Sequence, residues 1–191
     1  PLNWRAKADE IDYCLADAEA KAVFFDASSE EATRASGAAR ALPRIGVGPL
    51  EGSDATCDWE ALLAGPASPL QAAADAEDLS LMLYTAGTTG KPKGVPRRHR
   101  QERAAALAHV AQNLYRRGER TLGVMPLYHT MGVRSLLAMA LVDGVFVCMP
   151  RFDTQEALVL IEAERLTCLY LVPTLYHDLL TQRERAGHGS G

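Results

Sequence analysis

A short segment of small, hydroxyl-bearing and basic residues holds the groups that could bind a phosphate. Residues 85–95 read Thr-Ala-Gly-Thr-Thr-Gly-Lys-Pro-Lys-Gly-Val and follow the apolar run 79–84. Glycine lets the backbone approach a ligand closely, amides and hydroxyls can donate to phosphate oxygens, and lysine neutralises their charge. The pattern predicts a strand, a phosphate loop and then a helix, and so a nucleotide triphosphate site. The alternative is a solvated turn, because the same residue types are common in turns.

The spacing of the loop excludes two common nucleotide motifs. A Walker A loop has four residues between its first glycine and a Gly-Lys-Ser/Thr triplet. Counted from Gly87, the second glycine would fall at Pro92. A Gly-x-Gly-x-x-Gly dinucleotide fingerprint is also absent from the sequence. If the loop binds phosphate, it therefore belongs to another class of phosphate-binding protein.

Hydrophobic periodicity around the loop predicts alternating helices and strands. The helix after the loop is expected over about 99–117, with Arg116, Arg117 and Gly118 as its end signals. Its apolar stripe would consist of Ala104, Leu107, Ala108, Ala111, Leu114 and Tyr115. Other helices are predicted at 8–20, 59–64, before 142, from Asp153 through 161 and from Pro173, with Ser28 and Ser29 capping a further one. Strands are predicted at 22–25, 45–47, 79–84, 121–125, 145–149 and 168–172.

This alternation predicts the α/β class, with a parallel sheet that carries helices on both faces. Ligands of such sheets bind at the carboxyl ends of the strands. The phosphate loop, the segment around His129 and the segment 172–174 each follow a predicted strand. We therefore expect these three segments to line one crevice.

Composition narrows the function classes. The chain has 191 residues, 48% hydrophobic and 23% charged, with a net charge of −4. These values fit one ordinary globular domain and disfavour a general nucleic-acid surface. No apolar run approaches the roughly 20 residues of a membrane span, and no signal peptide is recognised. The four cysteines lack Cys-x-x-Cys spacing, which favours buried free thiols in a cytoplasmic protein.

The segment Tyr84 to Val95 closely resembles the signature loop of the adenylate-forming (AMP-binding) superfamily. The family string is roughly Tyr-Thr-Ser-Gly-Thr-Thr-Gly-x-Pro-Lys-Gly-Val, and this chain departs from it at Ala86. The family's downstream His-Arg stands at His99 and Arg100. Residues 125–132, Met-Pro-Leu-Tyr-His-Thr-Met-Gly, and 171–175, Leu-Val-Pro-Thr-Leu, are similar to two later family segments. The resemblance covers nearly the whole chain in the right order.

The resemblance implies part of the large N-terminal domain of an acyl-CoA or aryl-CoA synthetase. Within 1–191 it predicts upstream strand and helix units in 1–64, a connection in 65–78 and a phosphate-loop subdomain in 79–191. The implied activity is an AMP-forming acid–CoA ligase that activates a fatty or aryl carboxylic acid as an acyl-adenylate and then forms its CoA thioester. ATP, Mg²⁺ and coenzyme A are the implied co-substrates.

The resemblance also assigns roles to residues. Lys93 and His129 are the candidate catalytic residues, and Thr89 is the candidate metal ligand. Phosphate contacts are expected from Thr85, Ala86, Gly87, Thr88, Thr89, Gly90 and Lys93. The acyl pocket is expected to include Tyr128, His129, Met131, Gly132 and Val133, although Tyr128, Met131 and Val133 could equally be core residues. Arg134 could pair with a charged substrate or form a salt bridge at the rim.

Several family features are missing from the chain. It lacks the Tyr-Gly-x-Thr-Glu segment with its magnesium-linked Glu, the Asp that holds ribose and the C-terminal catalytic Lys, and it has no start methionine. We therefore expect a piece of a longer enzyme that needs the remainder of its chain and is inactive alone. Two alternatives stay open: a carrier-loading adenylation domain, and a non-catalytic nucleotide-binding relative, which the substitution at Ala86 would suit.

Overall fold

The chain divides into two compact units, each with its own strands and helices. A computed structural model describes residues 1–50, 52, 54–66, 69, 73–85 and 92–188, with side chains as far as residue 183. Unit 1 is Pro1–Arg97 and unit 2 is Arg98–Gly191. The subdivision predicted from the sequence, at 64 and 78, stays a prediction about the whole domain.

Unit 1 contains a small parallel sheet with strand order β1-β2-β3. These strands are β1 (Val23–Phe25), β2 (Arg44–Gly46) and β3 (Cys57–Asp58). Helix α1 (Ala8–Asp17) packs against α2 (Glu30–Ala35) and α3 (Gly37–Arg40), and α4 (Trp59–Leu63) follows β3. The helix predicted over 8–20 is confirmed as α1, and its residues Ile11 and Cys14 are buried. Ser29 stands at the start of α2 without a side-chain cap, because both serines bind Asp26 instead.

The phosphate-loop segment lies between two strands, β4 (Leu79–Thr85) and β5 (Lys93–Arg98), which pair in a sheet of their own. Strand β5 was not predicted from the sequence, which placed only a helix, from about residue 99, after the loop. Residues 86–92 are too few for a parallel crossover, which needs a dozen or more, so the two strands form an antiparallel hairpin. Helix α5 (His99–Gln112) begins only after β5.

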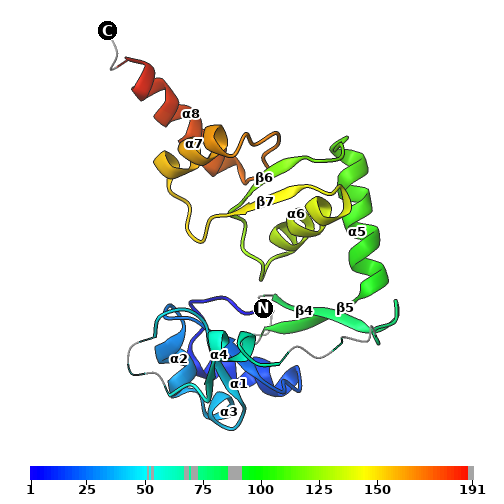
Figure 1. Cartoon of the computed structure of the whole chain (residues 1–191), viewed down its shortest axis with the longest axis vertical. Helices are drawn as coiled ribbons and strands as arrows, with labels where there is room; N and C mark the ends of the chain where they lie inside the picture. Colours follow the sequence, from blue (N-terminus) through cyan, green and yellow to red (C-terminus); the bar gives the residue numbers. More distant parts are fainter. Residues whose placement is uncertain (51, 53, 67–68, 70–72, 86–91, 189–191) are drawn as a thin grey trace. The chain divides into compact units, whose positions relative to one another are not determined.

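Unit 2 is a doubly wound α/β layer structure. Its strands β6 (Arg120–Gly123) and β7 (Val145–Cys148) pair in parallel, with Thr121 opposite Phe146. Thr121 also bridges Cys168 in parallel on its other side. The predicted strand 168–172 is thus reduced to a single bridge. Helix α6 (Thr130–Leu141) links β6 to β7, α7 (Thr154–Ala163) leads from β7 to Cys168, and α8 (Pro173–His188) follows (Figure 1).

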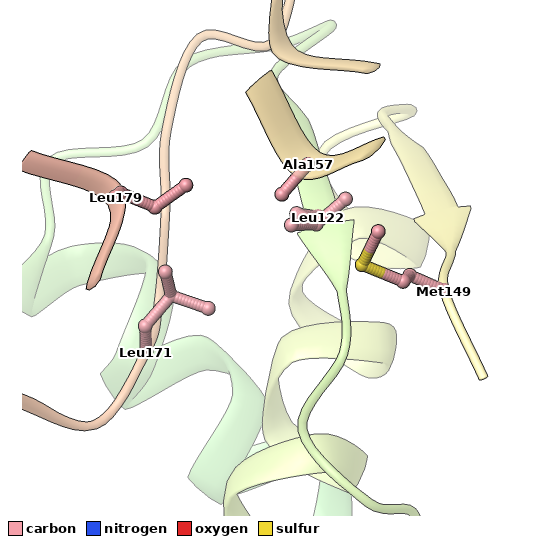
Figure 2. Close-up of a cluster of buried hydrophobic side chains, with 5 residues drawn as sticks. All are labelled: Leu122, Met149, Ala157, Leu171 and Leu179. Carbon is pink, nitrogen blue, oxygen red and sulfur yellow. The ribbon is translucent and has the colours of Figure 1, made fainter. Parts of the chain in front are cut away.

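Two apolar clusters show that both faces of the unit 2 sheet are covered. Leu122, Met149, Ala157, Leu171 and Leu179 form one buried cluster, between the sheet and helices α7 and α8 (Figure 2). The other cluster consists of Ala138 and Met139 of α6 and of Val142, the residue after α6. Phe146 and Cys168 pack against these residues. Side chains alternate along a strand, so Leu122 and its neighbour Thr121 serve opposite faces. The predicted α/β fold with parallel strands is confirmed.

Four helices end in the same way, and this ending shortens α5. After α1, α5, α6 and α7 a non-glycine residue adopts positive φ: Glu19, Leu114, Asp143 and Arg165. At α5 the amide of Leu114 bonds to the carbonyl of Ala111 and that of Tyr115 to Val110, which is a Schellman motif. The helix therefore ends at Gln112 and not near 117 as predicted.

The buried face of α5 also differs from the predicted stripe. Its buried residues are Glu102, Ala106 and His109, whereas Leu107 and Leu114 are exposed. The predicted stripe was drawn along the apolar residues of α5. In the structure, the face of α5 that packs against α6 is one that carries polar side chains. The cysteines differ as well: all four are free thiols, but only Cys14 is buried and Cys148 is exposed.

Candidate functional site

Of the residues predicted to contact phosphate, the structure describes Thr85 and Lys93. Thr85 ends β4 and Lys93 begins β5, and both are exposed. In an antiparallel hairpin these two positions lie at the same end, on either side of the loop. A hydroxyl and an ammonium group thus flank residues 86–91. The predicted contacts Ala86, Gly87, Thr88, Thr89 and Gly90 lie outside the described residues.

The hairpin is fixed to helix α1 through Tyr84. The Tyr84 hydroxyl donates to the carboxylate of Asp17 at 2.8 Å and lies 3.1 Å from the carbonyl oxygen of Cys14. The ring also contacts Tyr13 edge-on, with centroids 6.5 Å apart. Partial burial, followed by the bond to Asp17, raises the pKa of Tyr84 well above its usual range, so the phenol stays protonated. The residue directly before Thr85 is therefore held by three contacts.

Gly94 is a packing residue inside the same motif. A Cβ at this position would stand 2.8 Å from the Asp17 carboxylate and 2.9 Å from the sulfur of Met82. Only glycine allows β5 to lie this close to β4 and α1. Neither Asp17 nor the structural role of Gly94 was identified from the sequence. The glycine itself was the available signal, since glycine is favoured where the backbone must approach other groups closely.

The His129 segment lies between β6 and α6. His129 is exposed at the N-cap position of α6, and its ring tilts against Tyr128 with centroids 4.7 Å apart. Its amide bonds to the carbonyl of Pro126 at 3.0 Å, which forms a turn before the helix. Met131 is half-buried in the first helical turn. The structure thus leaves His129 and Tyr128 accessible beside the start of α6.

Gly132 and Val133 face the protein interior. A Cβ on Gly132 would stand 2.3 Å from the Pro126 carbonyl oxygen and 2.4 Å from that of Met125. Val133 is buried. The burial of Val133 fits the alternative, considered from the sequence, that it is a core residue. Gly132 permits a close backbone contact. Their predicted contact with substrate stays a prediction.

Within the described part of the chain, Arg134 does not form the rim salt bridge expected of it. Its Nε is buried and has no hydrogen-bond partner among the described residues. The charge of Arg134 acts instead on His109 of α5, where burial first and this charge second lower the pKa of the imidazole. His109 was missed from the sequence because nothing in the pattern of α5 distinguishes it.

Strand order places two of the predicted segments at one edge of unit 2. From β6 the chain moves to β7 on one side and then returns to Cys168 on the other. In open α/β sheets the reversal of direction creates a crevice outside the carboxyl ends of the strands, where ligands bind. The His129 segment follows β6, and Val172 follows Cys168 at this same edge. The predicted convergence is thus supported for two segments, and the phosphate loop belongs to the other unit.

Other features of the described residues bear on the site. A cavity of about 550 Å³ in unit 1 is lined by the N-terminal segment, α1, β1 and α2, and by none of the predicted site residues. In the described part of the chain, no cluster of three His, Cys, Asp or Glu side chains could hold a metal ion. None of the described helices is long and apolar enough to cross a membrane.

Comparison with known proteins decides the family. The model of a family described as "AMP-binding enzyme" matches residues 1–190. The chain belongs to the AMP-binding enzyme family. The predicted resemblance to adenylate-forming enzymes is therefore confirmed.

Two curated relatives of this chain are CoA ligases. The chain is 40% identical over 114 residues to 4-chlorobenzoate–CoA ligase of Pseudomonas sp., which covers 58% of this chain and 22% of that protein. It is 33% identical over 196 residues to a Mycobacterium tuberculosis ligase, 3-[(3aS,4S,7aS)-7a-methyl-1,5-dioxo-octahydro-1H-inden-4-yl]propanoyl:CoA ligase, covering 97% of this chain and 38% of that protein. The chain thus spans well under half of the length of these relatives.

Solved structures agree with the family fold. The N-terminal domain of FACL13 from Mycobacterium tuberculosis superimposes with a TM-score of 0.79 at 27% identity, over 94% of this chain and 44% of that one. ATP-bound MatB from Rhodopseudomonas palustris gives a TM-score of 0.76 at 30% identity, over 94% and 35%. The α/β fold of acyl-CoA synthetase N-terminal domains is therefore the fold of this chain.

Proposed function

We propose that this chain is part of an ATP-dependent, AMP-forming carboxylic acid–CoA ligase that acts on a fatty or aryl acid. The observation that carries the proposal is the family match over residues 1–190, together with the loop at 85–95. The relatives named above are CoA ligases, which favours this activity over a carrier-loading adenylation domain.

In this reaction a substrate carboxylate oxygen attacks the α-phosphorus of ATP, and the bond to pyrophosphate breaks. The CoA sulfur then attacks the acyl carbon, and AMP leaves. The first step requires the departing pyrophosphate to be held in line and its negative charge to be neutralised. Thr85 and Lys93 suit this task, because a hydroxyl donor and a cation flank the loop on an anchored hairpin. Loop residues 86–90 would supply further donors, and Thr89 would bind Mg²⁺.

The acid would bind at the carboxyl edge of the unit 2 sheet. His129 would stand near its reacting carboxylate, with Tyr128 and Met131 beside it. Backbone turns hold this segment in place, since the His129 amide is bonded to Pro126 and Gly132 packs against the same turn. The role of His129 is to position the acid.

An ATP–pyrophosphate exchange assay tests the proposal. The 191-residue chain alone should show no exchange, because the family residues for ribose, magnesium and the catalytic lysine are missing from it. A longer protein that contains this chain should show exchange with at least one acid in a panel of fatty and aryl acids. It should then form that acid's CoA thioester. Loading of a carrier protein without any CoA thioester would instead support a carrier-loading enzyme.

A charge deletion tests the role of the loop. In the longer protein, Lys93→Ala should lower exchange by about 100-fold or more, the usual loss for a group that stabilises developing charge. Lys21→Ala removes an equally exposed lysine from unit 1 and serves as the matched control. Unchanged exchange in Lys93→Ala would remove Lys93 from the site.

A further inference from the structure

One carboxylate of helix α1 contacts both strands of the hairpin that carries the phosphate loop. On β4, the Tyr84 hydroxyl donates to Oδ2 of Asp17 at 2.8 Å. On β5, a Cβ at Gly94 would stand 2.8 Å from the same oxygen atom, so the backbone of β5 lies directly against this carboxylate. Asp17 therefore stands where α1, β4 and β5 meet.

The contacts of Gly94 also define which residues of the hairpin lie side by side. A Cβ at Gly94 would stand 3.2 Å from Cε1 of the Tyr84 ring, so these two residues are cross-strand neighbours. In an antiparallel pair the next neighbours toward the loop are then Thr85 and Lys93. The strand bounds agree, since β4 ends at Thr85 and β5 begins at Lys93. Each residue that contacts Asp17 is thus adjacent in the chain to a residue predicted to contact phosphate.

Alternation along the strands separates the support from the binding groups. Successive side chains of a strand point to opposite faces. Tyr84 and Gly94 face α1, so Thr85 and Lys93 point away from it, and both are exposed. The negative charge of Asp17 is therefore on the face of the hairpin that would not meet the phosphates. The spacing between the Thr85 hydroxyl and the Lys93 ammonium group depends on how β4 and β5 pack on α1.

The exposure of Asp17 separates an effect on the reaction from an effect on folding. Asp17 is exposed, and a hydrogen bond at an exposed position contributes little to stability because water competes for both partners. In contrast, displacement of a group that holds the reacting atoms by about 1 Å can lower a rate about 100-fold. Loss of the Asp17 contacts should therefore affect the reaction more than the fold.

We propose that Asp17 is a positioning residue for the first step of the ligase reaction, and that it keeps Thr85 and Lys93 at the spacing needed to hold the departing pyrophosphate. The inference rests on the proposed ligase function and adds a residue of α1 to its phosphate site. Asp17 acts from behind the hairpin, through the Tyr84 hydroxyl and the backbone at Gly94. It does not touch the nucleotide, which a carboxylate would repel.

The kinetic constants of pyrophosphate exchange test this inference. In the longer protein, Asp17→Ala should lower kcat/KM for ATP by about tenfold or more and raise KM for ATP and for pyrophosphate, while KM for the acid should not change. A purely structural role would lower the fraction of folded enzyme, and hence kcat, without changing any KM. Unchanged KM values for ATP and pyrophosphate overturn the inference alone. Absence of exchange by the unsubstituted longer protein with every acid of a panel overturns the ligase function itself.

Further variants assign the effect to these contacts. Asp17→Asn keeps an oxygen acceptor for Tyr84 and the volume beside Gly94, and should restore most of kcat/KM for ATP. Addition of Asp17→Ala to Tyr84→Phe should lower kcat/KM for ATP little further, because the two side chains act through one bond. The control Asp9→Ala removes an exposed carboxylate from the first turn of the same helix and should leave every kinetic constant unchanged.

Two outcomes of these variants would contradict the proposal. Fully multiplicative losses in the double variant would show that Asp17 acts independently of Tyr84. If Asp17→Ala does not fold, Tyr84→Phe alone decides, since it should raise KM for ATP and pyrophosphate and leave KM for the acid unchanged. A folded Tyr84→Phe enzyme with unaltered KM values would show that the hairpin contact to α1 has no role in positioning.

Discussion

In unit 2, strand β6 lies between two helical layers, whereas in unit 1 the parallel sheet leaves large apolar side chains in solvent. Leu122 and Thr121, which face opposite sides of β6, are 1% and 0% exposed. On β1, Phe24 is 57% exposed and contacts only the edge of Trp59 among described aromatic rings. Parallel strands are normally covered on both faces. The central strand of unit 2 is therefore buried on both faces, whereas unit 1 depends in part on polar anchors such as the bond between Tyr84 and Asp17.

Buried side-chain atoms without a hydrogen-bond partner among the described residues occur in both units, at Glu30 and Arg44 in unit 1 as well as in unit 2. In unit 1 the site-bearing hairpin is held by the Tyr84 hydroxyl, which bonds to Asp17 of α1. In unit 2 the helix layer encloses His109 Nε2 and Arg134 Nε without partners among the described residues. Satisfied polar groups stabilise a position, while unsatisfied buried groups lower stability unless another molecule pairs with them.

The largest effect should come from the core of unit 2. Leu122→Ala removes a fully buried side chain and should lower the free energy of unfolding by about 3 kcal/mol. Urea denaturation of the 191-residue chain, followed by circular dichroism, measures the change. The exposed Leu180→Ala, on α8 of the same unit, is the control and should cost little. A loss below about 1 kcal/mol for Leu122→Ala would show that this core is not closed.

Substitutions of Gly132 and Gly94 compare a glycine that is surrounded by backbone atoms with one that is surrounded by side chains. In Gly132→Ala the new methyl group meets backbone carbonyls of Met125 and Pro126, which cannot move aside. In Gly94→Ala it meets the side chains of Asp17 and Met82, which can rotate. We expect a loss of about 3 kcal/mol for Gly132→Ala and about 1 kcal/mol for Gly94→Ala, within the usual range for overpacking.

Thermal unfolding of both glycine variants checks the order. The reverse order would mean that the hairpin of unit 1 is packed more rigidly than the turn before α6. Such a result would contradict the proposed dependence of unit 1 on adjustable polar anchors.

Removal of one hydroxyl tests the anchor of the hairpin. Tyr84→Phe keeps the ring contact with Tyr13 but loses the bond to Asp17, and should cost about 1 kcal/mol, typical for one hydrogen bond. Amide hydrogen exchange of β4 and β5 should become faster, while exchange in β6 should not change. Tyr176→Phe removes a hydroxyl bonded to the Leu169 carbonyl in unit 2 and provides the comparison. Equal acceleration in both units would refute a local anchor.

The smallest effect, and a stabilising one, is expected at a helix end. Leu114 is 83% exposed and has a φ of 53° at the end of α5. Leu114→Gly should raise the free energy of unfolding by about 1 kcal/mol, because glycine adopts this conformation without steric cost. Glu19→Gly at the end of α1 provides the same test in unit 1. A decrease in the melting temperature of either variant would contradict this account of the helix ends.

Local signals along the sequence predicted many elements correctly. Asp153 and Glu156 marked the start of α7, and the Asp153 carboxylate indeed accepts from the Glu156 amide at 2.8 Å. Pro173 begins α8 as expected. Capping residues and proline act within one helical turn, so neighbouring residues suffice to define them. The C-terminal end of α5 was predicted wrongly, because Leu114 adopts positive φ although nothing in its type favours it.

Contacts between distant segments were harder to predict from the sequence. Residues 93–98 contain a glycine and a proline and look unlike a strand, yet they pair with β4. The buried face of α5 follows its packing on α6 rather than its apolar residues. These outcomes depend on side chains and strands far away along the chain, and tertiary contacts routinely outweigh local propensity.

The sequence by itself determined the family, and with it the chemistry to be expected, because the residues that bind phosphate in this family are contiguous between Tyr84 and Val95. A contiguous motif needs no folding information to be recognised. Only the tertiary structure decided that this loop joins two strands, that Asp17 bonds to Tyr84 beside it, and that His109 is buried against Tyr170. Each of these facts requires residues tens of positions apart to meet, which happens only when packed layers bury their surfaces against one another.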